Sequence, residues 1–286
     1  MRSPPPEALV LCGIGSVQFG AALANELFAQ AGPAGVVLLR IALSALLLMA
    51  IARPSLRGRT RNDLGAAVVF GLVLAAMNWS FYEALDRLPL GVAVTIEFTG
   101  PLAVAVAGSR RLLDLAWVAL AGGGVVLLAL RGGHHGIHAS GVALALVAAA
   151  CWAAYILLSQ RVGAVFARLD GLAVALAVGS VLVIAPGVVE GGSALLRPGV
   201  IAGGLGVALL SSLIPYSLEI VALRNLSAAA FGLLMSLEPA VAALAGVIVL
   251  GQALTAVIGI ALVMVVAASI GTTLTSRRLP RPQPEA

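Results

Sequence analysis

Two acidic residues lie next to prolines inside apolar segments, and they are the strongest chemical signal in the sequence. Glu97 is in "TIEFTGP", four residues before Pro101, and Glu238 directly precedes Pro239 in "SLEPA". A carboxylate at the centre of a bilayer costs about 3 kcal/mol on insertion scales, so it normally faces a protein interior or a water-filled cavity. Such a group can bind the ammonium of a ligand, or it can carry a proton.

The prolines predict interruptions of the helices that contain these acids. Pro101 has no N–H to donate to the carbonyl of Glu97, and Pro239 removes a hydrogen bond from its own helix. Thr99 and Gly100 indicate a helix restart with Thr99 as its N-cap, which would turn free amides toward a ligand. We therefore predict helix breaks at Gly100, Pro101 and Pro239, with a ligand ammonium near Glu97 and its carboxylate near the restarted helix.

Two alternatives remain open for these acids. Glu97 can instead be a protonated, hydrogen-bonded residue of a kinked packing helix, and Glu238 can simply satisfy the backbone freed at its kink. Arg40 lies roughly 12 Å from the nearer end of its apolar segment, at 1.5 Å per helical residue. At that depth it needs a carboxylate partner, which is either structural or shared with the ligand.

Further polar and aromatic residues lie within apolar segments and are candidates for lining a pathway. Such groups often hydrogen-bond helices together, and this is the competing interpretation for each of them. Glu26 and Glu83 lie near segment ends, where a solvated side chain is expected. The candidate lining residues are Asn78, Tyr82, Trp152, Tyr155, Tyr216 and Glu219, with Gln18 and Trp79 as further mid-segment polar residues.

Composition places these residues in a membrane protein. Of 286 residues, 61% are hydrophobic and only 10% are charged, and the mean hydropathy is +1.09. Apolar runs of about twenty residues, the length that crosses a bilayer as a helix, recur along the chain. All 17 basic residues are arginines, and most fall in short connectors. This placement indicates contact with a lipid bilayer and excludes nucleic acid as the partner.

The sequence predicts an all-α polytopic fold with ten transmembrane helices. Only Arg87, Arg131 and Arg197 fall in connectors on one side, so the positive-inside rule places both termini in the cytoplasm. The apolar start of the chain loosely imitates a signal peptide, but we interpret it as the first span. The predicted spans are 8–29, 33–52, 64–85, 89–108, 112–130, 140–160, 170–189, 199–222, 226–249 and 253–275.

An internal repeat relates the two halves of this single membrane domain, residues 1–286. Residues 84–108 align without gaps with residues 222–246, pairing Pro101 with Pro239 and Gly108 with Gly246. Because five spans separate the equivalent segments, the halves have opposite orientations in the bilayer, as in many secondary transporters. The predicted repeats cover residues 8–131 and 140–275, and residues 276–286 form a cytoplasmic tail.

The remaining reactive residue types do not suggest an enzyme. Cys12 and Cys151 lie within apolar spans, so we interpret them as packing residues and expect no disulfide. His134, His135 and His138 cluster in one connector without an acid or cysteine beside them, which disfavours a metal site. We expect no metal and no cofactor. A membrane enzyme acting on lipid substrates is the less favoured alternative, because no histidine lies inside a span.

Several motifs are similar to one transporter family. "LPLGVAVTIEFTGPLAVAV", "CWAAYILLSQRVG", "PYSLEIVAL" and "FGLLMSLEPAVAALAG" resemble the EamA branch of the drug/metabolite transporter superfamily, and within it the bacterial inner-membrane threonine and homoserine exporters. The resemblance covers almost the whole chain. One departure is Asn25, where relatives commonly have a lysine.

The resemblance implies a specific function and location. It implies a ten-helix inner-membrane transporter of two inverted five-helix repeats, which exports small amino acids by proton antiport with alternating access. The motifs carry Glu97, Pro101, Glu219, Glu238 and Pro239 as functional positions. A drug/metabolite exporter of broader specificity remains the alternative, and the sequence does not indicate an oligomeric state.

Overall fold

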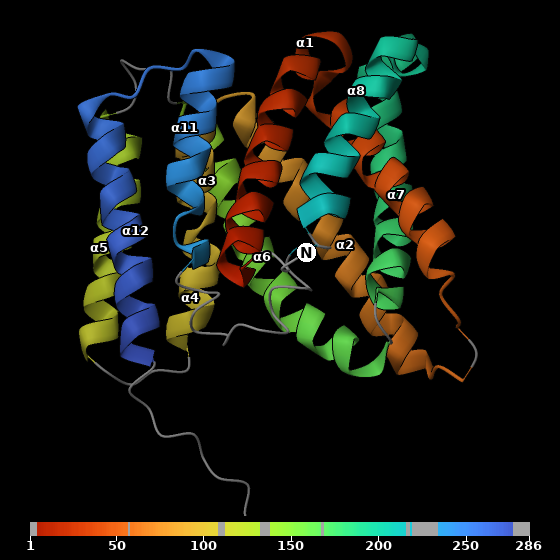
Figure 1. Ribbon diagram of the computed structural model, residues 1–286, viewed down its shortest axis with the longest axis horizontal. Helices are drawn as coiled ribbons and strands as arrows, with labels where there is room; N and C mark the ends of the chain where they lie inside the picture. Colours follow the sequence, from red (N-terminus) through yellow and green to blue (C-terminus); the bar gives the residue numbers. More distant parts are fainter. Residues whose placement is uncertain are drawn as a thin grey trace, which may run out of the picture.

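The computed structural model describes residues 5–56, 58–107, 112–131, 138–166, 169–215, 218 and 234–276, and in these ranges the chain is helical without strands. The helices stand side by side and run between the two ends of the molecule (Figure 1). We call these ends the Gly32 end, where the first helical hairpin turns, and the Arg53 end opposite it.

Helix α1 (Pro6–Ala52) is a hairpin of two arms joined at Gly32. Gly32 has φ 67° and ψ 163°, a conformation that glycine adopts readily, and Pro33 begins the second arm. The backbone N–H of Ala34 donates to Glu190 Oε2 at 2.8 Å, so a carboxylate from another helix caps the second arm. The two arms correspond to the predicted spans 8–29 and 33–52.

Helix α2 (Arg61–Leu85) follows a short connector at the Arg53 end. Its start has a capping box in which Thr60 Oγ1 accepts from the N–H of Asp63 at 3.2 Å and Asp63 Oδ2 accepts from the N–H of Thr60 at 2.9 Å. These two bonds satisfy backbone donors that a helix start otherwise leaves free.

The predicted span 89–108 is divided into two short helices. Helix α3 (Leu90–Glu97) ends at the acidic residue, Phe98 forms a turn, and α4 (Thr99–Ala107) continues the path. In the other half of the chain, α11 (Glu238–Leu250) begins at its acidic residue, with Pro239 in the first turn, where its missing N–H costs nothing.

The remaining elements complete the bundle around these broken segments. They are α5 (Leu112–Arg131), α6 (Ala139–Val165), α7 (Asp170–Gly191), the 3₁₀ segment η2 (Gly192–Leu196), α8 (Pro198–Ala208), the π-helical segment η3 (Leu209–Leu213) and α12 (Ala256–Ser276). The predicted end of the eighth span and start of the ninth, residues 219–233, lie outside the described residues.

Small residues let the helices approach closely. A Cβ on Gly71 of α2 would lie 2.5 Å from the carbonyl oxygen of Ala175 in α7, and one on Gly91 of α3 would lie 2.6 Å from the Cα of Ala243 in α11. Such contacts between small residues replace the hydrophobic driving force that is absent between helices in lipid. Helix α3 therefore approaches α11 closely at Gly91, although the two are far apart in sequence.

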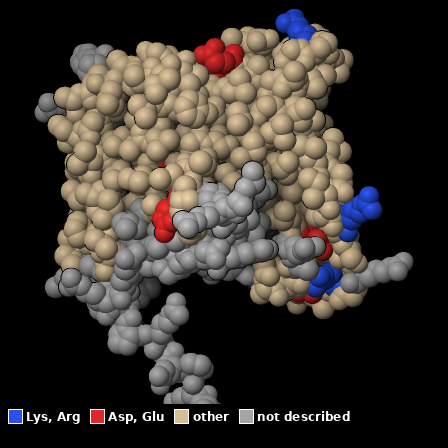
Figure 2. Space-filling view, viewed as in Figure 1, with Lys and Arg blue, Asp and Glu red and all other residues tan. Residues whose placement is uncertain are grey.

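The surface and the lengths of the helices identify a multi-pass membrane protein. The helical stretches long and apolar enough to cross a bilayer are Pro6–Ala52, Arg61–Leu85, Ala139–Val165 and Asp170–Leu196. Large apolar side chains are strongly exposed, among them Val189 (85%) and Leu196 (79%), and Figure 2 shows few charged side chains on the face it presents. A surface of this kind suits acyl chains rather than water.

Candidate functional site

Glu97 lies inside the protein and does not face the lipid. Its side chain is 8% exposed at the C-terminal end of α3, and every residue of this helix is buried. A carboxylate removed from water in this way needs a proton, a counter-charge or a polar ligand. The location therefore meets the first condition for a binding or proton-carrying residue.

Other charged groups lie close enough to Glu97 to interact with it electrostatically. The interacting groups are the carboxylate of Glu238 from α11 and the guanidinium of Arg40 from α1. Cys151 of α6 is in turn within the field of Glu97. Four elements from both halves of the chain therefore converge here. We call Glu97, Glu238, Gln18 and the partly buried Arg40 the buried polar cluster.

Arg40 is held by neutral groups, which differs from the expected carboxylate pairing. Its Nη1 donates to Tyr82 Oη at 3.1 Å, its Nη2 donates to the carbonyl of Ser211 at 3.3 Å, and its Cζ lies 5.4 Å from the centre of the Tyr82 ring. Among the described residues, the ion pair that forms is Glu83–Arg87, and Arg40 has none. The guanidinium is thus positioned without a direct carboxylate contact among the described residues, so it can bind an anionic group.

Tyr82 is fully buried and presents its hydroxyl to Arg40. Its ring packs against Phe28 at 5.6 Å and Phe81 at 6.0 Å between ring centres. These contacts fix the ring, so the hydroxyl and the aromatic face together hold the guanidinium in one place.

Gln18 joins the cluster by bridging two distant segments. Its Nε2 donates to Glu238 Oε1 at 3.0 Å, with 2% and 6% of the two residues exposed. The sequence identifies Gln18 as a mid-span polar residue, and the structure assigns it the helix-bridging bond expected of that type. Its position beside Glu238 depends on how the first arm of α1 packs against α11, which no local motif encodes.

The helix interruption lies at Phe98, directly after Glu97, whereas the predicted break residues Gly100 and Pro101 lie inside α4. Thr99 Oγ1 donates to the carbonyl of Ile96 at 2.7 Å, so this hydroxyl serves the preceding turn and differs in role from the expected N-cap. Phe98 contacts Trp152 edge to face, with 5.7 Å between ring centres. Gly100 packs against the backbone of Ala149 in α6, and α4 also contacts α5 and α12.

Of the other predicted lining residues, two lie in described helices and two lie outside the described residues. Asn78 is buried and its Nδ2 donates to the carbonyl of Leu74 at 2.8 Å, within its own helix. Tyr155 packs against Phe70 with 5.2 Å between ring centres. Tyr216 and Glu219 lie outside the described residues.

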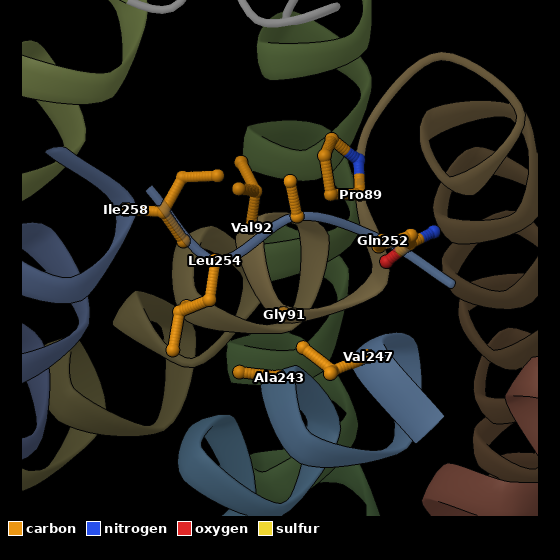
Figure 3. A pocket seen from close by; sticks show the side chains of 9 residues that line it. Pro89, Gly91, Val92, Ala243, Val247, Gln252, Leu254 and Ile258 are labelled. Carbon is orange, nitrogen blue, oxygen red and sulfur yellow. The ribbon is translucent and has the colours of Figure 1, made fainter. Parts of the chain in front are cut away.

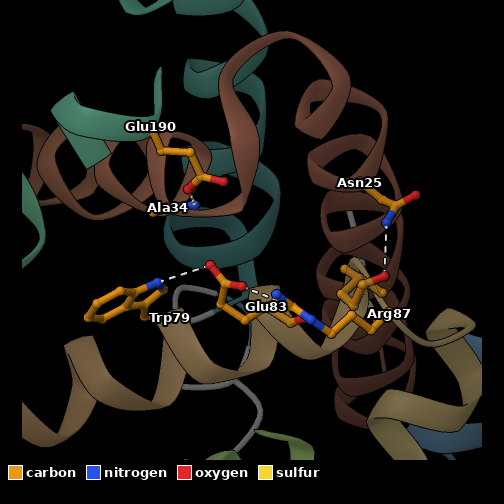
Figure 4. Close-up of polar contacts among 7 residues, drawn as sticks. Asn25, Ala34, Trp79, Glu83, Arg87 and Glu190 are labelled. Carbon is orange, nitrogen blue, oxygen red and sulfur yellow. Dashed lines mark hydrogen bonds and ion pairs between the residues drawn. The ribbon is translucent and has the colours of Figure 1, made fainter. Parts of the chain in front are cut away.

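A second set of polar contacts lies near the Gly32 end (Figure 4). Glu83 accepts from Trp79 Nε1 at 3.3 Å and from Arg87 Nη1 at 2.7 Å. Asn25 Nδ2 donates to the carbonyl of Leu85 at 3.2 Å, which connects α1 to α2. Glu83, for which the sequence predicts a solvated side chain, is only 21% exposed and pairs with Arg87.

A small hollow lies between α3, α11 and the start of α12, and none of the predicted site residues lines it (Figure 3). Gln252 Oε1 accepts from the N–H of Leu90 at 2.9 Å there and caps the start of α3. The lining residues are Pro89, Gly91, Val92, Ala243, Val247, Gln252, Ala253, Leu254 and Ile258. Within the described ranges no group of His, Cys, Asp and Glu has the arrangement of a metal site.

Comparison with known proteins gives a consistent set of similarities. Residues 139–274 match the EamA-like transporter family. The threonine/homoserine exporter RhtA of Salmonella typhimurium LT2 is 43% identical over 277 residues, covering 96% of this chain and 94% of the relative. RhtA of Escherichia coli K12 is 43% identical over 274 residues, covering 96% and 92%. The crystal structure of a protein 20% identical to this chain has a TM-score of 0.63 and covers 95% of this chain and 98% of that one, which indicates a shared fold.

Proposed function

The chain belongs to the EamA-like transporter family, and we propose that it exports small hydroxylated amino acids such as threonine and homoserine. The relatives that carry this activity in their names are 43% identical along almost the full length of both chains. The observation that supports the proposal is the burial of Glu97 beside Glu238 and Arg40, because a zwitterion has two opposite charges that a carboxylate and a guanidinium can bind.

The proposed architecture is ten transmembrane helices in two inverted five-helix repeats. Exchange of the halves would map the first arm of α1 onto α6, α2 onto α8 with η3, and α3 with α4 onto α11. The packing supports this mapping in two ways. In one half α6 packs against α2, and in the other the equivalent α1 packs against α8 and η3. Likewise α3 and α4 pack against α6, and the equivalent α11 packs against α1. Equivalent helices α3 and α11, and likewise α5 and α12, also contact each other.

The substrate binds at the buried polar cluster in this proposal. Its ammonium lies at Glu97 and its carboxylate at the guanidinium of Arg40, which has no carboxylate partner among the described residues. The orientation of Arg40 by Tyr82 limits the rotamer freedom lost on binding. Thr99, Asn78, Trp152, Tyr155, Tyr216 and Glu219 are proposed to line the path.

Transport proceeds by alternating access in the bacterial inner membrane, with both termini cytoplasmic and protons as the counter-substrate. The arginine distribution supports this orientation. The interruption at Phe98 supports the mechanism, because a broken helix at a binding site can rearrange without unfolding a full span.

The test is export of threonine and homoserine from preloaded cells carrying Glu97→Gln, with Glu26→Gln as the matched control. Glu26 undergoes the same chemical change but is an exposed residue. We expect Glu97→Gln to lose most of the efflux per inserted protein and Glu26→Gln to retain it. Unaltered efflux by a normally inserted Glu97→Gln variant contradicts the proposed site.

A further inference from the structure

The side-chain amide of Gln18 has its nitrogen hydrogen-bonded, whereas its oxygen is buried without a hydrogen-bond partner among the described residues. Nε2 donates to Glu238 Oε1, whereas Oε1 has no hydrogen-bond partner among the described residues, although the residue is 98% buried. Buried carbonyl oxygens are nearly always hydrogen-bonded, and exceptions often mark positions that a ligand or water fills. This unpartnered acceptor lies within the buried polar cluster.

We infer that Gln18 is a specificity-determining residue whose Oε1 accepts a hydrogen bond from the side-chain hydroxyl of the substrate, in an orientation set by Glu238. The inference rests on the proposed function and deepens it. The substrate ammonium is best matched by a carboxylate, and Glu97 supplies one. A neutral amide oxygen is matched to a neutral donor, which in threonine or homoserine is the hydroxyl.

Glu238 determines which end of the amide faces the substrate. An ionised carboxylate only accepts hydrogen bonds, so it holds the Nε2 of Gln18 and leaves Oε1 as the free acceptor. When a proton from the water on the other side of the membrane binds to Glu238, the carboxyl O–H can donate to Oε1. The amide then turns, its N–H donors face the substrate, and the acceptor for the hydroxyl is lost.

The surrounding groups allow Glu238 to act as this switch. Glu238 interacts electrostatically with Glu97 from α3, and Glu97 interacts in turn with Arg40 from α1. Segments α8, η3 and α12 contain no charged residue, and the charged residues of α7 are at its ends. Of these groups, Glu238 is the one hydrogen-bonded to Gln18, so its protonation acts on the amide directly.

The experiment compares export of threonine with that of valine, which has the same shape without the hydroxyl, from proteoliposomes containing the full chain. For Gln18→Leu we expect the threonine-to-valine ratio to fall about tenfold while valine export persists, because one hydrogen bond to the hydroxyl is lost. The matched control is Asn25→Leu, which removes another helix-bridging amide from the same arm and should leave the ratio unchanged.

The possible outcomes separate this inference from the proposed function. Wild-type protein that transports neither threonine nor homoserine refutes the function itself. Wild-type transport with an unchanged ratio in Gln18→Leu overturns the role of Gln18 and leaves the function standing. If Gln18→Leu does not insert, Gln18→Met, which has a similar length and no amide, is measured in the same way.

The dependence on Glu238 has its own readout. The ratio in wild-type protein should fall as the pH is lowered and Glu238 gains its proton, whereas the ratio in Glu238→Gln should not change with pH. A merely structural bridge between α1 and α11 would affect the amount of inserted protein but not the pH profile of the ratio. A wild-type ratio that is independent of pH overturns the proposed control by Glu238.

Discussion

Gly100 is the position at which the structure predicts the sharpest response to one added methyl group. It lies two residues after the interruption at Phe98, where α4 contacts α6. A Cβ at this position would clash with the carbonyl oxygen of Ala149 and would lie 2.8 Å from its carbonyl carbon and 3.1 Å from its Cα. All three atoms belong to the backbone of α6, so no side-chain rotation relieves the overlap.

The size of the effect follows from these contacts. Carbon atoms prefer a separation of about 3.5 Å, so the 2.8 Å contact alone requires the two helices to separate by roughly 0.7 Å, and the closer carbonyl oxygen requires more. Overpacking of this kind costs about 1–3 kcal/mol, which exceeds the gain of up to about 1 kcal/mol from replacing glycine by alanine in a helix. Because α4 is connected to Glu97 through Phe98, the displacement also moves the carboxylate.

We therefore expect Gly100→Ala to lower both the melting temperature in detergent and the efflux per inserted protein, the latter about tenfold, since 1.4 kcal/mol corresponds to a factor of ten. Gly259→Ala in α12 is the control, because its added Cβ meets no atom within 4 Å. If Gly100→Ala is as stable and as active as Gly259→Ala, the close contact of α4 with α6 does not hold the site, and the reasoning fails.

Three further changes test other contacts. Tyr82→Phe keeps the ring but removes the hydroxyl that accepts from Arg40; threonine efflux should fall about tenfold at low substrate concentration, and an unchanged apparent affinity would show that Arg40 needs no orientation. Gly91→Val forces α3 away from the α11 backbone, so a cysteine placed in the hollow of Figure 3 should react faster with a water-soluble thiol reagent. Glu190→Ala removes the cap on the N–H of Ala34 and should destabilise the protein by about 1 kcal/mol, whereas Glu190→Gln should retain most of the stability in a thermal melt.

The sequence indicates that the acid- and proline-containing segments are interrupted, but the first break lies at Phe98, and the predicted break residues Gly100 and Pro101 lie inside α4. Pro101 cannot donate to the carbonyl of Glu97, and the helix ends at Glu97. Pro239 is tolerated in a first helical turn, and α11 begins one residue before it. The family resemblance is likewise confirmed, because its motifs are contiguous and do not depend on how the helices pack.

The partners within the buried polar cluster do not follow from the sequence. In a membrane bundle the lipid-facing and interior sides of a helix are both apolar, so periodicity does not reveal which side of α1 faces α11. Arg40 needs a partner at its depth, but the choice of the Tyr82 hydroxyl and the Ser211 carbonyl depends on the rotation of three separate helices. The bond between Gln18 and Glu238 joins residues 220 positions apart and has the same origin.

The charge balance of the cluster gives a physical reason for the proposed coupling of export to protons. With Glu97 and Glu238 ionised and Arg40 protonated, these three groups carry one net negative charge, which is costly to hold away from water. A zwitterionic amino acid adds no net charge, but during the outward step its ammonium and carboxylate form ion pairs with the charged groups of the cluster. The empty carrier has no such ion pairs. The free-energy cost of its return step is therefore lowest when one carboxylate is protonated and the cluster is neutral. Removing one of the two acids by Glu238→Gln makes the empty cluster neutral without that proton, so this variant should still exchange one amino acid for another but should no longer concentrate it against a gradient when a pH difference is imposed.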